Sequence, residues 1–280
     1  PKNEKGELID SSFSYKYYKR HFFDYFDLAD DRMLRTPIFK DKLKEYMTRL
    51  TPQNPDSISI MADYLLNKSE SNDEVFKYLL IYFLNKYADS KIMGMDAIYV
   101  HLVENYYAKN KATWLDSVQL YRITDRASKL KYTLIGKTAP RIVLPDTSNK
   151  QQDLYRINSD YTLLYFWDPT CGHCKKVTPK LKKVYDSLRT ENISVEVYAV
   201  CTEIERDKWI DYIKENELSW INVADFEVKH PFRYYYDIQA TPKLYILDRN
   251  REIIAKRLGV EQIPDFLTNY GKMVAKRKKK

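Results

Sequence analysis

The sequence predicts two domains, an all-helical domain over residues 1–137 and an α/β domain with a mixed sheet over residues 138–280. Two observations lead to this prediction. In the first half, apolar residues recur at spacings of three and four, without the strict alternation of a half-buried strand. In the second half, short apolar runs alternate with helical segments and are separated by prolines. A length of 280 residues lets each domain bury its own core.

Helices in the first half are expected at 36–50, 57–67, 94–108 and 114–132, with a further helix that begins near residue 71. The start of that helix has the clearest signal, the cap sequence Ser71-Asn72-Asp73-Glu74. Apolar residues then follow at helical spacing and form a stripe on one side: Val75, Tyr78, Leu79 and Phe83. Two prolines and one asparagine at 51–55 predict the turn between two of these helices.

The second half is expected to form a mostly buried sheet. Residues 161–167 are apolar or aromatic at consecutive positions, which indicates a strand covered on both faces. Further strands are predicted at 141–144, 153–157, 193–201, 243–248 and 252–256, and helices at 175–188, 203–216, 229–236 and from 261 onward. The last two strands are expected to pair antiparallel and close the sheet.

The charge of the chain is positive but unevenly placed. The formal net charge is +8, and the chain ends in Lys276, Arg277, Lys278, Lys279 and Lys280. These five residues supply all of the excess positive charge of the second domain, so its folded part is neutral. We therefore expect a solvated basic tail and no nucleic-acid partner.

The candidate for chemistry is Cys171-Gly172-His173-Cys174, which directly follows the buried strand. A CxxC pair alone fits redox chemistry, half of a zinc site or a structural role. Here the pair opens a predicted helix, whose first amides and dipole would favour a thiolate at Cys171. Cys174, one turn on, could then resolve a mixed disulfide formed at Cys171.

The remaining metal-ligand types do not complete a zinc site. The chain has three cysteines, an odd number that is too few for a disulfide framework. Cys201, His21, His101 and His230 show no paired spacing, so we expect no metal, although copper binding through His230 stays open. Cys201 ends a predicted strand and is expected to be a small buried hydrophobe.

These motifs resemble a known family. Leu163-Leu164-Tyr165-Phe166-Trp167 followed by Thr170-Cys171-Gly172-His173-Cys174-Lys175 resembles the active-site strand and helix of thioredoxins. Pro179 matches the proline inside that helix, and Thr241-Pro242 resembles the family's cis-proline loop. The opening strand near Ala139 and the long spacing to Pro242 resemble the TlpA and ResA branch of extracytoplasmic bacterial thioredoxins. Residues 1–137 are similar to a helical domain of unknown function that precedes such modules.

The resemblance implies a thiol-disulfide oxidoreductase with an α/β thioredoxin-like fold. Cys171 and Cys174 would be catalytic, and Gly172, His173 and Trp167 would shape the active-site loop and the thiol pKa. Thr241 and Pro242 would bind substrate through the backbone. The redox-active disulfide Cys171–Cys174 would be the only redox group, without a further cofactor. The expected partners are cysteine-containing protein substrates and a membrane or soluble thiol redox partner.

The resemblance also implies a compartment. It favours the bacterial periplasm, and the start at Pro1 leaves open a leader that carries a lipid anchor. The oligomeric state is not predicted.

Two departures from the family bear on mechanism. Tyr165 stands where thioredoxins carry a buried proton-relay carboxylate, and Val177 stands where ResA-type proteins carry an acid. His173 makes the motif similar to that of protein disulfide isomerase, which favours an oxidising disulfide. The TlpA and ResA resemblance favours reduction, so the direction stays open. The rival hypothesis is a redox-silent scaffold whose helical domain captures a peptide or glycan.

Overall fold

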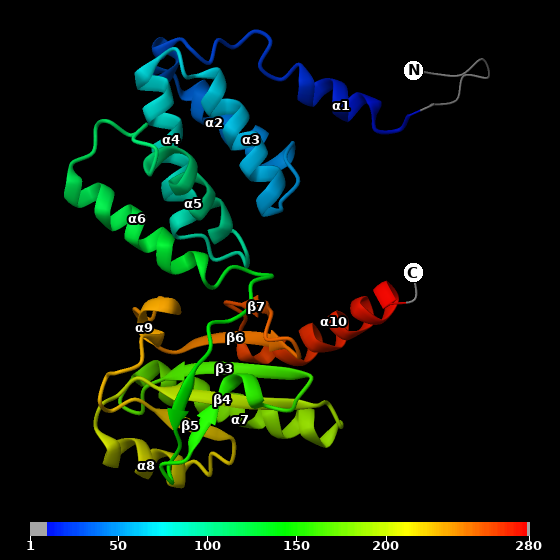
Figure 1. Ribbon diagram of the computed structural model, residues 1–280. Helices are drawn as coiled ribbons and strands as arrows, with labels where there is room; N and C mark the ends of the chain where they lie inside the picture. The colour runs from blue at the N-terminus through cyan, green and yellow to red at the C-terminus, as the bar shows by residue number, and fades with distance from the viewer. Residues whose placement is uncertain (1–9, 279–280) are drawn as a thin grey trace. The chain divides into compact units, whose positions relative to one another are not determined.

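The computed structural model describes residues 10–278 (Figure 1), so Lys279 and Lys280 of the predicted basic tail lie outside the described residues. The chain divides into two compact units, residues 1–90 with 95–124 and residues 91–94 with 125–280. Across the described part, no helix is long and apolar enough to cross a membrane.

The described part of the first unit is helical, as predicted. Its helices are α1 (Phe13–Arg20), the 3₁₀ turn η1 (Asp31–Arg35), α2 (Pro37–Arg49), α3 (Pro55–Lys68), α4 (Asp73–Ala88), α5 (Asp96–Leu102), η2 (Val103–Tyr107) and the first turns of α6 (Ser117–Lys131). Local sequence sets several starts. Asn72 caps α4 by accepting from the amides of Glu74 and Val75, at 3.1 and 3.2 Å.

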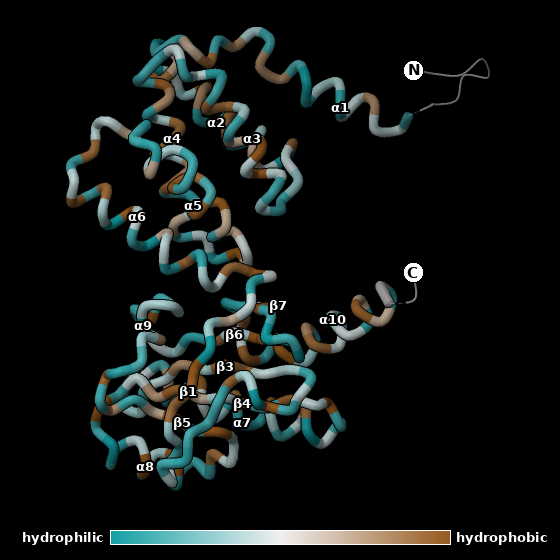
Figure 2. Tube along the Cα trace, viewed as in Figure 1, coloured by the Kyte–Doolittle hydropathy of each residue, from teal (hydrophilic) through white to brown (hydrophobic). Residues whose placement is uncertain are grey.

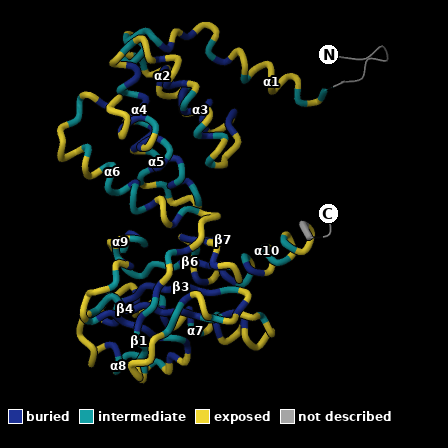
Figure 3. The backbone as a smooth tube through the Cα atoms, in the orientation of Figure 1, coloured by how far each residue is buried: buried dark blue, intermediate teal, exposed yellow. Residues whose placement is uncertain are grey.

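The core of the first unit forms where apolar stripes of neighbouring helices meet. Leu65, Leu79 and Ile98 are fully buried and come from α3, α4 and α5. By contrast, α1 buries none of its residues, as the exposed colours along it show (Figure 3). The single helix predicted over 94–108 is wrong in detail, because α5 ends at Leu102 and the chain continues as the π-helix η2.

The second unit contains a five-stranded mixed sheet. Its strands are β3 (Tyr161–Trp167), β4 (Val195–Cys201), β5 (Ile221–Ala224), β6 (Lys243–Asp248) and β7 (Ile253–Lys256), in the order β5-β4-β3-β6-β7. The pairs β3–β4 and β4–β5 are parallel, whereas β3–β6 and β6–β7 are antiparallel. A separate hairpin pairs β1 (Val143–Pro145) with β2 (Gln151–Asp153). The predicted mixed sheet and its antiparallel closing pair are confirmed.

Helices and loops cover both faces of this sheet, so β3 is buried along almost its whole length, and hydrophobic residues gather in the sheet (Figure 2). One face packs against α7 (Gly172–Thr190), α8 (Arg206–Glu215) and α10 (Ile263–Lys278). The other face packs against the β1 hairpin, the 3₁₀ turn η3 (Leu154–Arg156) and α9 (Phe232–Tyr235). Tyr165 and Trp167 point into the first core, and Leu164 and Phe166 into the second.

Two local predictions differ from the structure. The strand expected over 153–157 is mostly a 3₁₀ turn, because the Asp153 carboxylate accepts from the Tyr155 amide at 3.0 Å and caps that turn. The short edge strand β5 was not predicted. It lies within the long segment between Cys174 and Pro242, together with α8 and α9.

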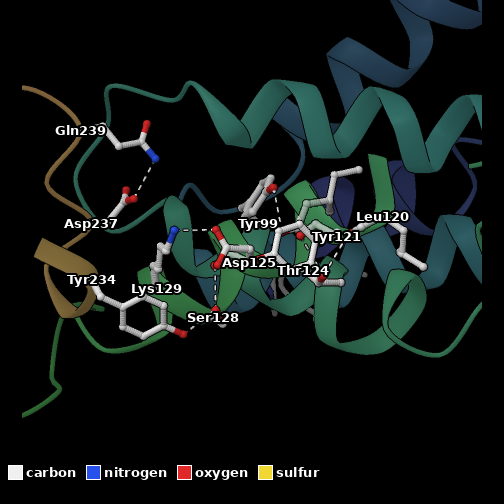
Figure 4. Close-up of polar contacts among 11 residues, drawn as sticks. Tyr99, Leu120, Tyr121, Thr124, Asp125, Ser128, Lys129, Tyr234, Asp237 and Gln239 are labelled. Carbon is white, nitrogen blue, oxygen red and sulfur yellow. Dashed lines mark hydrogen bonds and ion pairs between the residues drawn. The ribbon is translucent and has the colours of Figure 1, made fainter. Parts of the chain in front are cut away.

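The last turns of α6 belong to the second unit and contact α9 (Figure 4). The hydroxyls of Ser128 and Tyr234 lie 3.2 Å apart, and Lys129 pairs with Asp125 at 2.6 Å. The ring of Tyr132 also packs against that of Tyr235, with centroids 5.1 Å apart. These contacts pack α6 against α9, and the chain continues from α9 to the Thr241-Pro242 loop.

Candidate active site

The site is built at the carboxyl end of the central strand β3. After Trp167 the chain turns at Asp168, whose carboxylate accepts from both the amide and the hydroxyl of Thr170, each at 2.6 Å. The Cys171 amide donates to the Asp168 carbonyl at 3.2 Å. This turn delivers Cys171 to the N-cap of α7 with an extended backbone, so its side chain lies beside the free amides of the first helical turn.

Cys171 is the more accessible of the two motif thiols. Burial alone would raise its pKa, but hydrogen bonds from the Cys174 amide and the Thr241 side chain outweigh this and lower the pKa below its usual value. The direction agrees with the sequence-based expectation of a thiolate stabilised by helix amides. A lower thiol pKa means that more of Cys171 is the nucleophilic thiolate near neutral pH.

Cys174 is fully buried one turn further along α7. Burial raises the pKa of its thiol to about 12, although the Asp168 amide and the Thr241 side chain act to lower it. The Asp168 amide donates to Cys174 Sγ at 3.4 Å. Cys174 is therefore held protonated at neutral pH and shielded from solvent, in contrast to Cys171.

The loop that precedes β6 lies directly against Cys171. The Thr241–Pro242 peptide bond is cis, as the resemblance implied. Cys171 Sγ lies 3.5 Å from the Thr241 carbonyl oxygen, and the Thr241 side chain also acts on both sulfurs. The structure thus brings Cys171, Cys174 and Thr241 together from segments about seventy residues apart in sequence.

The other residues of the predicted active-site loop divide into two groups. Gly172 and His173 are exposed on the first turn of α7, and the His173 amide contributes to the lower pKa of Cys171. Trp167, which was expected to shape this loop, ends β3 directly before Asp168, and its side chain is fully buried. Its ring packs against Tyr212, with centroids 5.1 Å apart.

Sequence reasoning missed a buried hydroxyl pair beneath the motif. Tyr165 OH lies 2.9 Å from Thr178 Oγ1, and both side chains are fully buried. The sequence spacing could have indicated that Thr178 lies beside the motif, because Thr178 is four residues after Cys174 and therefore on the same face of α7. Val177 is partly buried and packs against the same core.

Comparisons with known proteins agree with this geometry. Residues 158–253 match a family described as thioredoxin-like, and residues 7–133 match a domain of unknown function. A thioredoxin-like protein from Bacteroides caccae has the same fold, with a TM-score of 0.72, 22% identity, and coverage of 93% of this chain and 94% of that one. This chain contains a thioredoxin-like domain. The predicted fold class is confirmed over both parts of the chain.

Two further relatives of this thioredoxin-like protein carry names that refer to thiol chemistry. Sporulation thiol-disulfide oxidoreductase A of Bacillus subtilis is 30% identical over 109 residues, which span 38% of this chain and 65% of that protein. A domain of possible thiol-disulfide isomerase from Cytophaga hutchinsonii is 40% identical, with coverage of 51% of this chain and 97% of that one and a TM-score of 0.48. The chain therefore spans just under two thirds of the Bacillus relative.

The third cysteine and the candidate metal ligands lie outside the Cys171–Cys174 pair. Cys201 is buried at the end of β4, in register with Trp167, and burial raises its pKa to about 12. Within residues 10–278, no group of three or more His, Cys, Asp or Glu side chains is arranged to hold a metal ion. His230 Nδ1 accepts from the Phe232 amide at 3.1 Å.

Proposed function

We propose that this protein exchanges its Cys171–Cys174 dithiol or disulfide with cysteine-containing protein substrates. The observation that carries the proposal is the contrast between the two thiols. Cys171 is accessible with a lowered pKa, whereas Cys174 is buried with a pKa raised to about 12. An exposed nucleophile beside a protected resolving thiol is the arrangement that disulfide exchange requires.

In the reductive direction, the Cys171 thiolate attacks one sulfur of a substrate disulfide. The substrate S–S bond breaks, and its other sulfur leaves as a thiolate that takes up a proton from solvent. Cys174 then loses its proton and attacks Cys171 Sγ. The mixed disulfide breaks, the second substrate sulfur leaves, and a Cys171–Cys174 disulfide remains. Two electrons have passed from the enzyme dithiol to the substrate disulfide.

The Thr241-Pro242 loop supports a protein substrate. The Thr241 carbonyl lies at Cys171, so a substrate chain bound there could use backbone hydrogen bonds regardless of its side chains. A membrane or soluble thiol protein would then return Cys171 and Cys174 to their starting state. The name of the Bacillus relative supports this class of reaction. A periplasmic location is part of the proposal and rests only on the resemblance of the motifs to extracytoplasmic bacterial thioredoxins.

The test is a set of cysteine variants of the full chain assayed with a disulfide-bonded protein such as insulin. Cys171→Ser should abolish turnover. Cys174→Ser should still attack but accumulate a mixed disulfide, which mass spectrometry detects as an added mass that dithiothreitol removes. Cys201→Ser serves as the matched control and should retain activity. Full activity of Cys171→Ser, or three unreactive thiols in the parent protein, would instead support the redox-silent scaffold.

The redox direction needs a separate measurement. An equilibrium titration against glutathione buffers gives the reduction potential of the Cys171–Cys174 couple. A potential near those of isomerases supports an oxidising or isomerising role, which the exposed His173 next to the thiolate favours. A potential near that of thioredoxin supports reduction. Changing His173 to Pro should lower the potential if the imidazole stabilises the Cys171 thiolate.

A further inference from the structure

The resolving thiol, Cys174, must lose its proton inside the core. Cys174 must become a thiolate before it can attack the mixed disulfide, yet burial holds its pKa at about 12. The strand position that would supply a carboxylate in the family holds Tyr165. Cys174 shares its core cluster with several titratable side chains, among them Cys171, Tyr165 on β3, Cys201 on β4 and Tyr212 on α8.

The groups around Cys174 offer hydroxyls in place of a carboxylate. Thr178 lies one turn beyond Cys174 on the same face of α7, and its hydroxyl is 2.9 Å from that of Tyr165. Burial raises the pKa of Tyr212, whose ring is only partly buried, and the Thr178 side chain acts to lower it. The set therefore extends from Tyr165, which is fully buried in β3, to Tyr212 on α8, which is partly exposed to solvent.

A charge on the resolving sulfur acts on both tyrosines. Burial is the largest cause that raises the pKa of Tyr165, and the charge of a Cys174 thiolate raises it further. Burial likewise raises the pKa of Tyr212, and Cys174 again adds to this effect. Both phenols are therefore neutral at physiological pH, so each can accept and donate a proton but does not remain as a phenolate.

We propose that the Tyr165, Thr178 and Tyr212 hydroxyls form a proton relay that carries the Cys174 proton toward solvent during resolution. This proposal rests on the proposed thiol-disulfide exchange. Each hydroxyl accepts one proton and donates another, so the chain ends neutral with its hydrogen bonds reversed. The proton from Cys174 Sγ finally reaches water beside Tyr212. The sulfur gains the electron pair with which it attacks Cys171.

A hydroxyl relay has an advantage in this core. An ionised carboxylate at position 165 would have to be buried without a partner, which is unfavourable and shifts the carboxylate pKa upward. A phenol that is hydrogen-bonded to Thr178 has no such charge to bury. Tyr165, Thr178 and Tyr212 are thus positioning residues that act through the proton of Cys174 and not on the substrate.

The test separates the two chemical steps with the aromatic disulfide dithionitrobenzoate. Added to the fully reduced protein, it should release one coloured thiolate when Cys171 attacks and a second when Cys174 resolves the mixed disulfide. Stopped-flow absorbance reports both phases. The informative pair is Thr178→Val, which removes the hydroxyl at nearly constant shape, and Thr178→Ser, which keeps it.

We expect Thr178→Val to slow the second phase by about tenfold or more, as loss of assisted proton transfer does, while the first phase keeps its rate. Thr178→Ser should stay within about twofold of the parent protein in both phases. Tyr165→Phe should slow the second phase like Thr178→Val. In the slowed variants the second-phase rate should rise with hydroxide between about pH 6 and pH 9, because solvent base replaces the relay.

A matched control comes from the opposite face of the same sheet. Tyr198 on β4 is fully buried and donates to the Gln152 carbonyl at 2.8 Å. Tyr198→Phe loses a comparable hydroxyl and should change neither phase. Equal slowing of both phases by Thr178→Val, or a second phase in Thr178→Ser as slow as in Thr178→Val, would overturn the relay.

The two proposals fail in different ways. If the parent protein releases only one equivalent of thiolate, the proposed exchange between Cys171 and Cys174 is wrong. If the parent releases both equivalents while Tyr165→Phe and Thr178→Val resolve at the parental rate across the pH range, exchange stands and the relay is wrong. Thermal unfolding of each variant, followed by circular dichroism, identifies any variant whose second unit has lost its fold.

Discussion

Cys171 and Cys174 carry the same side chain, and their surroundings alone make them different. The helix amides act on Cys171 at the N-cap of α7, whereas the core excludes water from Cys174 one turn later. Thr241 acts on both, because its side chain lowers the pKa of each thiol. A residue seventy positions away in sequence therefore tunes the chemistry of the motif.

At this scale, the Thr241 hydroxyl can be tested directly. Thr241→Val removes the donor at similar volume and should raise the pKa of Cys171 toward the free value of about 8.5, because a hydrogen bond to a thiolate favours the charged form. The rate of iodoacetamide alkylation as a function of pH gives that pKa. Thr241→Ser keeps a hydroxyl and should retain the low midpoint. Identical midpoints in the parent and Thr241→Val would contradict the assignment.

The helix α7 holds both cysteines of the site, and its first turn has space for a larger side chain at Gly172. A Cβ placed on Gly172 would find no neighbouring atom within 4 Å, and the backbone there is not left-handed. Glycine is therefore not needed for the fold at this position. We expect Gly172→Ala to fold normally and to stabilise the protein by about 0.5 kcal/mol, through the lower entropy of the unfolded chain.

Activity with a protein substrate gives the second readout for Gly172→Ala. If its turnover of insulin stays within about twofold of the parent, the glycine has no steric role. A large loss of turnover with an unchanged alkylation profile would show that the substrate backbone approaches Gly172 closely. Chemical denaturation measures the stability change, with an exposed Ala variant on the solvent face of the same helix, Lys176→Ala, as the control.

Elements also show what the sequence could and could not predict. The strand β3 was predicted from its apolar run and α7 from the position of the cysteine pair at its start, which are local signals, whereas Pro179 was matched to the family. The edge strand β5 was missed because four residues carry too little periodicity, and its strand character comes from pairing with β4. The π-helix η2 was missed because it differs from an α-helix only in hydrogen-bond spacing.

At the scale of the whole molecule, family resemblance supplied what local patterns could not. The Cys171 and Thr241 contact joins two segments that only the folded sheet brings together, so the loop was predicted from its likeness to thioredoxins. The Tyr165 and Thr178 pair had no such precedent and required the packed core to be seen.

The folded state as a whole should lose stability in alkaline solution. Burial raises the pKa of Cys174 and of Cys201 to about 12, above the free thiol value. A raised pKa means that the unfolded chain releases the proton first, so stability is complete below about pH 8.5 and falls as the pH rises toward 12. Between pH 9 and pH 10.5, each buried thiol should cost the reduced protein about 2 kcal/mol.

Urea unfolding of the second unit as a function of pH measures this loss, and oxidation provides the internal control. In the oxidised protein Cys174 has no proton to release, so its share of the decline, about 2 kcal/mol, should disappear. Buried tyrosines such as Tyr165 and Tyr212, whose pKa values burial also raises, contribute equally in both forms. Cys201→Ala should remove a share similar to that of Cys174 in the reduced protein. Parallel declines in all three forms would mean that neither buried thiol couples folding to pH, and would also weaken the case that Cys174 needs a relay to lose its proton.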